Sequence, residues 1–435
     1  MGSRTYHDPL HGAIRLEREN PAEALVIDLV DTAPFQRLRR IRQLGPAFLT
    51  FHGAESSRFT HSLGVLHLAR LAMGHLRERN EGLDATSLGD NLALLYGAAL
   101  LHDLGHGPLS HTGEEMYGFR HESWSGRVIR EHPEVRRCLD RHDPRLAERV
   151  AALLEDGAGA PAAIRALVSS QLDCDRLDYL LRDSYSTGTR FAQLDLERIL
   201  ASLTLAPDGS LALHPRGLMA VEHYLVARSL MYRSVYNHRL NVVCNWLLRQ
   251  TIATARRLGP ERVWADRVMD RWLWQPGALT IDDFLANDDL RTGYHLLRWR
   301  EEGPEPLQEL GRRLLDRRLL RATDVSGLPT HGRLELLALA RRLSEAAGQT
   351  ADLSCGLQQQ QIRGYHPYKG GLRLWDGRRL EALEHRSALV ESLIRPTETA
   401  WLIHPKAVSQ ALRSALEQRL AGADSGDLPT AGAGP

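Results

Sequence analysis

The sequence has few of the residues that mark disulfide-rich, membrane-spanning or nucleic-acid-binding proteins. Its four cysteines are widely separated in 435 residues, which argues against a disulfide framework and against a zinc–thiolate site. It has no run of about 18 apolar residues, and the segment Met1–Leu10 lacks the apolar stretch of a signal peptide. The formal net charge is +1, which gives no indication of an acidic partner. We therefore expect a cytoplasmic globular protein that contacts no membrane and binds no nucleic acid.

Lysine is nearly absent as well. Of 55 basic residues, only Lys369 and Lys406 are lysines, and the others are arginines. In so arginine-rich a chain, any single arginine is weak evidence for an anion site, because most arginines lie on the solvated surface.

Apolar residues recur at helical spacing through most of the first 350 residues. Predicted helices cover residues 33–45, 61–79, 90–105, 163–185, 218–259 and 328–348. Asp-Gly pairs at 208–209 and 376–377 interrupt alternating apolar and polar residues and predict two hairpins. The patterns together predict a mostly α protein, with a helical core over 1–349, a small α+β region over 350–422 and a disordered tail over 423–435.

Titratable residues lie at the C-terminal end of the most apolar predicted helix, 90–105. His102 and Asp103 are neighbours, and neighbours on a helix point about 100° apart, so they share a metal only if other helices supply ligands. His61 and Asp175, on two other predicted helices, are the best candidates. Two imidazoles and two carboxylates suit magnesium, manganese, iron, cobalt or zinc. On residue types alone, satisfied core histidines are an equal alternative.

A second group of polar residues has the pattern of a proton-transfer site. His111 and Glu114 are three residues apart and share one face if a helix resumes after Pro108. A carboxylate behind an imidazole stabilises its charged form. His106 lies between this pair and the metal candidates, and His121 is a further candidate. The alternative is a surface loop rich in glycine.

Asp175, Tyr179 and Asp183 form one stripe of a helix at spacings of four residues. A metal ligand, an aromatic plate and a second carboxylate would then face the same way. Arg58 and Arg228 are the best candidates to meet phosphate oxygens. The alternative is a core aromatic with a solvated aspartate.

Several motifs in order resemble one known family. They are "DPLHGAIRLE" (8–17), "DTAPFQRLRRIRQLG" (31–45), "RFTHSLG" (58–64), "HDLGHGPLSH" (102–111), "DCDRLDYLLRD" (173–183) and "MYRSVYNHR" (231–239). The set is similar to the HD-domain deoxynucleoside triphosphate triphosphohydrolases, which include bacterial dNTPases and the animal enzyme with an added SAM domain. The resemblance covers roughly residues 4–250.

The resemblance implies a role for each matching residue. The divalent metal ion would be held by His61, His102, Asp103 and Asp175. The catalytic groups would be His106, His111, Glu114 and His121. Substrate would contact Gln43, Arg58, Arg176, Tyr179, Asp183, Arg228, Tyr236 and His238. Tyr232 and Asn237 depart from the animal enzyme, which has His and Gln there, so the base preference is open.

The implied reaction is metal-dependent hydrolysis of a dNTP to deoxynucleoside and inorganic triphosphate, with water attacking the α-phosphorus and His111 protonating the 5'-oxygen. Asp31, Gln36 and Arg39 match positions that read an activating guanine nucleotide in allosteric members. An ordinary exposed helix face is the alternative for these three. Nucleotide activation would favour a homo-oligomer, a dimer or tetramer. Rival functions are another HD phosphohydrolase, acting on a monophosphate, cyclic nucleotide or alarmone, and a nucleotide-sensing or nucleic-acid-binding module with weak catalysis.

Overall fold

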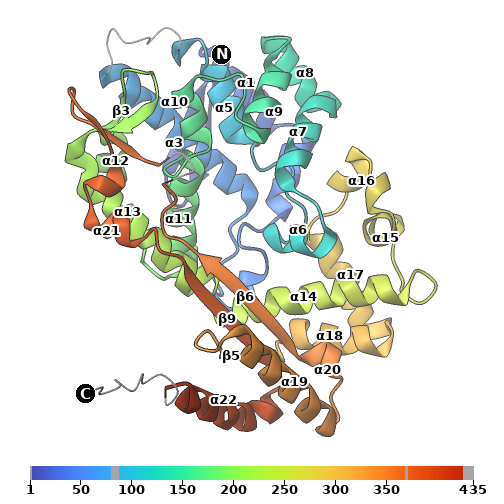
Figure 1. Ribbon diagram of the computed structural model, residues 1–435. Coiled ribbons are helices and arrows are strands. Elements are labelled where there is room, and N and C mark those ends of the chain that lie inside the picture. The colour runs from blue at the N-terminus through green and yellow to red at the C-terminus, as the bar shows by residue number, and fades with distance from the viewer. Residues whose placement is uncertain (1, 80–87, 368–370, 425–435) are drawn as a thin grey trace, which may run out of the picture.

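A computed structural model describes residues 2–79, 88–367 and 371–424, and helices dominate it (Figure 1). This confirms the expected mostly α fold with a helical core and a small α+β appendage. The predicted disordered tail lies outside the described residues from 425 onward. Among the described residues, no helix combines the length and apolar character that a membrane crossing needs.

The centre of the main core is formed by α5 and the helices that pack around it. α5 (Leu92–Leu101) is apolar on every side, and all its residues after Leu92 are buried. A helix without a polar face must be covered all round, and α5 packs against α1 (Pro21–Val30), α3 (Arg58–Arg79) and α9 (Leu146–Glu155). α11 (Cys174–Thr187) lies on the other side of α3. This packing places the ends of α3, α5 and α11 side by side.

The predicted helix over 218–259 is broken in the structure. α13 (Leu218–Met231) runs into a π-helical turn at Tyr232–Tyr236, and α14 (Arg239–Leu258) begins after His238. The backbone of His238 is extended, and its side chain caps α14 by accepting from the backbone N–H of Leu240. Periodicity alone did not reveal the break because both helices keep the same apolar spacing.

Two other predicted helices are shorter than expected. Residues 33–45 form only α2 (Ala33–Arg37) and a 3₁₀ turn, because residues 41–43 instead pair with 56–58 through backbone hydrogen bonds. Residues 163–185 split into α10 (Ala162–Val168) and α11. Asp173 caps α11 by accepting from the backbone N–H groups of Ser170 and Arg176. The cap sets Asp175 in the first turn of α11.

Further helices surround these elements. They are α6 (His111–Tyr117), α7 (His121–Glu131), α8 (Pro133–His142), α12 (Leu196–Ser202), α15 (Arg267–Trp274), α16 (Ile281–Leu285), α17 (Asp289–Glu302), α18 (Glu305–Leu315), α20 (Ala351–Ser354) and α21 (Ala388–Ser392). α14 to α18 enclose a second apolar core around Trp272 and Trp299.

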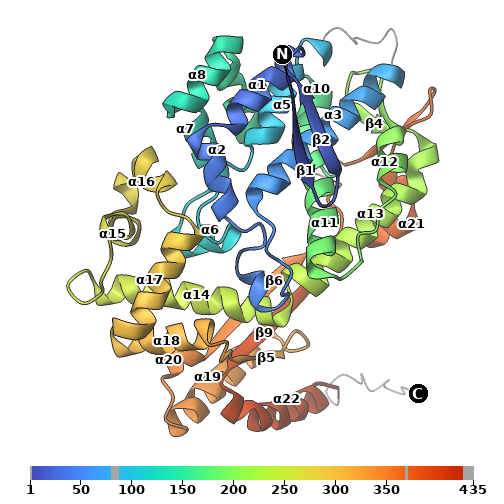
Figure 2. The same ribbon diagram turned by 180° about the vertical axis from the view of Figure 1, so that it is seen from behind.

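Hairpins account for most of the strands. β1 (Ser3–Asp8) and β2 (Gly12–Glu17) form an antiparallel pair that the sequence reading missed, and Figure 2 shows it beside α3 and α11. Both Asp-Gly hairpins are confirmed: β3 (Leu203–Leu205) with β4 (Leu211–Leu213), and β7 (Arg373–Trp375) with β8 (Leu380–Ala382). β4 and β7 pair in parallel and join the two hairpins into one sheet.

The third sheet has the strand order β5 (Arg321–Asp324), β9 (Thr397–His404), β6 (Gly356–Ile362). α14 lies on one side of it, and α19 (Thr330–Ala346) and α22 (Ser409–Asp424) cover the other (Figures 1 and 2). Two sheets therefore join strands from before and after residue 349. The domain division at 349/350 stays a prediction.

Candidate active site

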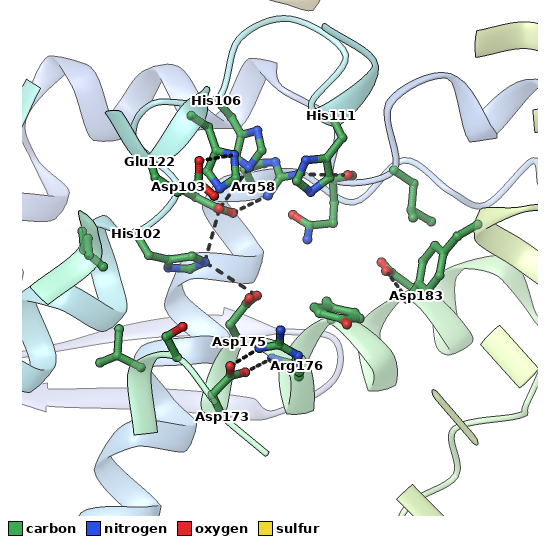
Figure 3. Close-up of a pocket in the computed structure, with 18 of the residues that line it drawn as sticks. Arg58, His102, Asp103, His106, His111, Glu122, Asp173, Asp175, Arg176 and Asp183 are labelled. Atoms are coloured by element: carbon green, nitrogen blue, oxygen red, sulfur yellow. Dashed lines mark hydrogen bonds and ion pairs between the residues drawn. The ribbon is translucent and has the colours of Figure 1, made fainter. Parts of the chain in front are cut away.

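The ends of α3, α5 and α11 surround a cavity of about 450 Å³, within the size range of small-ligand sites. Of the residues that the sequence singled out, its lining contains Gln43, Arg58, His102, Asp103, His106, His111, His121, Asp175, Arg176, Tyr179, Asp183 and Tyr236. Figure 3 shows that His102, Asp103 and Asp175 converge near its middle, with His106 and His111 on one side and Asp183 at the far end.

The four predicted metal ligands lie together. Nε2 of His61 is 3.1 Å from Asp175 Oδ1, 3.6 Å from Asp103 Oδ2 and 3.3 Å from Nε2 of His102. Nε2 of His102 is 3.3 Å from Asp103 Oδ1 and 3.8 Å from Asp175 Oδ1. Ligand atoms about 2.1 Å from a shared ion lie about 3 to 4 Å from one another. The spacing of His61, His102 and Asp103 could hold one metal ion, and Asp175 lies beside both histidines at a distance at which it could join them.

The electrostatics of this group favour a cation. Burial by itself lowers the pKa of His61, but hydrogen bonds with Asp175 and Asp178 and the charge of Asp103 raise it to about 10. Carboxylates that favour a proton on His61 also favour a metal ion at the same place.

Arg58 orients one of these carboxylates. Its Nη1 donates to Asp103 Oδ2 at 2.6 Å and its Nε donates to Ser110 Oγ at 2.8 Å, and the side chain is buried. Burial raises the pKa of Asp103, but Arg58 and the neighbouring histidines hold it well below its usual value. The Arg58 guanidinium thus has a partner already, although it borders the cavity.

The chain turns sharply between the metal group and α6. Leu109 and Ser110 both adopt positive φ, at 61° and 56°, which costs energy for residues other than glycine. The turn is held by the backbone N–H of Leu109, which donates to Asp289, and by Ser110 Oγ, which donates to the Arg42 carbonyl. This turn starts α6 at His111, so that its first turn faces the cavity.

Glu114 gathers three histidines. Its Oε1 lies 2.7 Å from Nδ1 of His111, 3.0 Å from Nδ1 of His121 and 3.5 Å from Nδ1 of His106. His106 also reaches Asp103, with its Nε2 3.3 Å from Oδ1. The same four residues, His106, His111, Glu114 and His121, form a second group that could hold a metal ion.

The charge states within this group differ. Burial raises the pKa of Glu114, but hydrogen bonds from His111 and His121 bring it below its usual value. Burial lowers the pKa of His121, yet the hydrogen bond and charge of Glu114 raise it. Burial and the charge of Arg58 keep the pKa of His106 well below its usual value. Within this end of the site, the surroundings therefore favour a proton on His121 over one on His106.

The far end of the cavity is built by α11 and the π-helical turn. Tyr236 donates its hydroxyl to Asp183 Oδ2 at 3.0 Å, while the buried Asp183 Oδ1 has no hydrogen-bond partner in the described residues. Tyr179 packs edge-on to Tyr236, with ring centroids 6.1 Å apart. Burial raises the pKa of Asp183 to about 7, and the Tyr236 hydrogen bond opposes the shift. An unpaired buried oxygen is a place for a ligand hydroxyl.

The other predicted substrate contacts are placed differently. Arg176 pairs with Asp173 at the edge of the cavity. Arg228 lies outside the cavity lining and donates to Gln171 Oε1 at 3.1 Å; it borders an adjacent hollow that shares Tyr232 with the cavity. His238 is also outside the lining, with its ring edge against Phe51.

The three predicted regulatory residues lie on the surface away from this cavity. Arg39 Nε donates to Gln36 Oε1 at 2.8 Å, and its guanidinium lies 3.5 Å from the ring centroid of Phe59. Asp31 pairs with Arg4 of β1 at 2.6 Å. Gln36 and Arg39 are therefore in contact, whereas Asp31 is tied to the hairpin.

The sequence reading missed two residues behind the metal group. Asp178 is fully buried, and its Oδ2 lies 2.8 Å from Nδ1 of His61. His11, in the β1–β2 turn, lies 2.6 Å from Asp178 Oδ1. Asp178 and Arg182 at i and i+4 on an apolar helix were the available signal, since a buried ion pair needs a reason. His11 lies in the motif over residues 8–17, but its contact with Asp178 could not be predicted because 167 residues separate the two.

Comparison with known protein families agrees with this site. The HD domain model matches residues 58–183, which contain all four predicted metal ligands, and the HD-associated region model matches residues 194–272. The YwfO protein of Bacillus subtilis, described as uncharacterized, is 34% identical over 317 residues, which cover 73% of this chain and 71% of that protein. The helical cavity and its His-Asp set are those of an HD-domain phosphohydrolase. The chain belongs to the HD-domain family, which confirms the resemblance found in the sequence.

Other relatives match over less of their length. The deoxynucleoside triphosphate triphosphohydrolase SAMHD1 of Danio rerio is 32% identical over 231 residues, 45% of this chain and 36% of that protein. Three further uncharacterized relatives are covered over 49%, 61% and 56% of their lengths, so the chain spans about half of several relatives. A crystal structure of a phosphohydrolase from Bacteroides thetaiotaomicron has a TM-score of 0.80 at 24% identity, covering 93% of this chain and all of that one. That likeness concerns the fold.

Proposed function

We propose that the protein hydrolyses deoxynucleoside triphosphates to deoxynucleoside and inorganic triphosphate in a metal-dependent reaction. The observation that carries this proposal is the layout of one cavity: the metal group lies at its middle, the Glu114 histidines on one side, and Tyr179 with Asp183 at the far end. A nucleotide lying along it would present its α-phosphate to the metal group and its sugar to Asp183. Relatives named as dNTP triphosphohydrolases support the same substrate class.

His61, His102, Asp103 and Asp175 would hold the metal ion. When bound, a divalent ion supplies Lewis acidity that polarises a phosphoryl oxygen and acidifies water. Asp103 is kept ionised and oriented by Arg58. Asp175 is the more exposed carboxylate of the group, at 34% of its side chain, so water and substrate would reach the group from its side.

The Glu114 group would provide the proton for the leaving 5'-oxygen. His111 and His121 both contact Glu114, and this carboxylate raises the pKa of His121. His111 is largely exposed, and its neighbour His121 is mostly enclosed. We assign the donation of this proton to the two histidines that share Glu114. Of these, His111 is nearer to solvent, from which a new proton would come after each turnover.

Tyr179, Asp183 and Tyr236 would read the sugar. A 3'-hydroxyl donating to Asp183 Oδ1 would satisfy the oxygen that has no partner among the described residues. Tyr179 would pack against the deoxyribose and leave no room for a 2'-hydroxyl. Arg176 and Arg58 line the cavity and would contact the phosphates. Arg228 would reach a triphosphate tail only past Tyr232.

The test is product analysis. The full chain is incubated with each dNTP and each NTP in magnesium, manganese or cobalt, and products are separated by ion-exchange chromatography. Inorganic triphosphate and deoxynucleoside are expected from at least one dNTP. If no dNTP yields triphosphate, even with a guanine nucleotide added, the proposal is wrong. Release of phosphate from a nucleoside monophosphate, or of a linear monophosphate from a cyclic nucleotide, would instead identify another HD-type hydrolase.

Regulation and assembly are further parts of this proposal. Asp31, Gln36 and Arg39 would bind an activating nucleotide at a contact between copies of the chain. Size-exclusion chromatography with light scattering, with and without a guanine nucleotide, tests this: a nucleotide-dependent increase in mass is expected, and an unchanged mass would contradict it.

A further inference from the structure

The turn of the N-terminal hairpin reaches the metal group from behind. β1 ends at Asp8, whose Oδ1 accepts the backbone N–H groups of Leu10 at 2.8 Å and His11 at 2.9 Å. These two hydrogen bonds fix the turn, so that the His11 ring points inward. Its Nε2 lies 2.6 Å from Asp178 Oδ1, and the two side chains are 5% and 0% exposed. A residue near the start of the chain thus contacts the core of α11.

Asp178 is shared among three partners. Its Oδ2 accepts from Nδ1 of His61 at 2.8 Å and from Nε of Arg182 at 2.8 Å, and its Oδ1 meets His11 and Nη2 of Arg182 at 3.0 Å. Arg182 Nη1 donates in turn to Asp8 Oδ2 at 2.9 Å. The hairpin turn, Asp178 and Arg182 therefore close a ring of buried hydrogen bonds.

This ring of hydrogen bonds determines which imidazole nitrogen of His61 presents a lone pair to the cavity. A carboxylate accepts but does not donate, so the hydrogen between Asp178 and His61 belongs to Nδ1 of His61. Nε2 is then the nitrogen that would offer its lone pair to a metal ion, and it is Nε2 that lies among Asp175, Asp103 and His102. A carboxylate behind a metal-binding histidine fixes its tautomer and ring orientation.

Gly64 provides independent evidence that this contact is built into the packing. It lies one turn after His61 on α3, and a Cβ there would be 1.9 Å from Asp178 Oδ1 and 2.5 Å from Arg182 Nη2. Any side chain would displace the carboxylate from His61. The same helix therefore supplies the metal ligand and the gap through which Asp178 reaches it.

We propose that His11 and Asp178 are positioning residues of the metal centre, and that the β1–β2 turn is part of that centre. The inference rests on the metal-binding part of the proposed function and not on the identity of the substrate. His11 holds the Asp178 carboxylate on the side away from His61, so its removal would let Asp178 rotate and loosen His61. Loss of such outer contacts weakens metal binding about 10- to 100-fold.

The experiment measures Mn²⁺ binding to the full chain by electron paramagnetic resonance of the free ion. The relevant site is the one that His102→Ala abolishes. His11→Ala is expected to raise the Mn²⁺ dissociation constant at least about 10-fold, and His11→Gln, whose amide can still donate to Asp178, is expected to recover part of the loss. His67→Ala is the matched control: its ring centroid is 5.2 Å from that of His11, and it has no hydrogen bond or ion pair to Asp178.

Thermal unfolding of each metal-free variant separates positioning from stability. If His11→Ala and His67→Ala lower the melting temperature alike, but only His11→Ala weakens Mn²⁺ binding, the inference holds. If His11→Ala binds Mn²⁺ as the wild type does, the turn is structural and the inference is overturned. A wild-type chain that binds Mn²⁺ but hydrolyses no dNTP overturns the proposed substrate and leaves this inference standing. A wild-type chain with no Mn²⁺ site overturns both.

Discussion

The imidazole of His106 stacks on that of His121, with ring centroids 3.9 Å apart and planes inclined by 13°. The two rings nevertheless differ in charge. Burial and Arg58 hold the pKa of His106 well below its usual value, whereas Glu114 overcomes burial and raises the pKa of His121. A proton shared between the two rings is therefore more stable on His121 than on His106, which also contacts Asp103. This difference supports His121 over His106 as a proton donor.

Glu114→Gln is expected to lower kcat about 100-fold or more and to move the alkaline limb of the pH profile. The carboxylate raises the pKa of His121, so its loss lowers that pKa, and the protonated form disappears at a lower pH. The measurement is kcat between pH 5.5 and 9. Glu115→Gln is the matched control, since Glu115 is exposed and pairs with Arg249. An unchanged alkaline limb in Glu114→Gln would contradict the role of the Glu114 group.

Removal of the metal ion is expected to abolish activity reversibly. Protein treated with a chelator should hydrolyse no dNTP, and added Mn²⁺ should restore the rate. His102→Ala and Asp103→Ala should each reduce activity about 10³-fold or more, because each removes a ligand of the proposed ion that would polarise the phosphate. Activity that survives in both variants would refute the metal assignment. Asp103→Ala also leaves Arg58 without its carboxylate, so it should be the less stable of the two.

Tyr179→Ala is expected to relax the choice between deoxyribose and ribose. Opening space beside the sugar should raise kcat/KM for an NTP relative to the matching dNTP about 10-fold or more, in the range that a small steric difference supplies. Tyr179→Phe keeps the ring and should keep the preference. The measurement is kcat/KM for each pair of nucleotides. Equal discrimination in Tyr179→Ala and wild type would place the selectivity elsewhere.

Asp183 is expected to make the protein less stable as the pH rises from about 4 to 7. Its pKa is about 7 in the folded chain and about 4 in an unfolded one, so the folded state binds the extra proton within that window. The free energy of unfolding therefore falls with pH there, by about 1 to 4 kcal/mol from this residue. Urea unfolding of Asp183→Asn should show a smaller fall than wild type. Tyr236→Phe removes the hydrogen bond that lowers this pKa and should extend the fall to higher pH; the same pH dependence in all three proteins would contradict the assignment.

Much of the helical core could be predicted from residue patterns. α3 has nearly its predicted bounds, and α5 ends four residues before the predicted bound of 105; both carry apolar residues along their whole length. Both Asp-Gly hairpins were predicted because the turn chemistry is local. The helix over 33–45 was predicted too long, since its second half pairs instead with residues 56–58. The apolar spacing within residues 33–45 contains no information about that pairing.

The sequence by itself determined which chemical groups the site contains: His61, His102, Asp103 and Asp175 stand out as polar residues on apolar helices. Only the tertiary structure decided how each is used. It set Arg58 on Asp103 rather than in open solution, left His238 outside the cavity as a helix cap, and brought His11 onto Asp178. The physical reason is that periodicity reports the face of a single helix, whereas hydrogen bonds between buried charges depend on how separate helices approach.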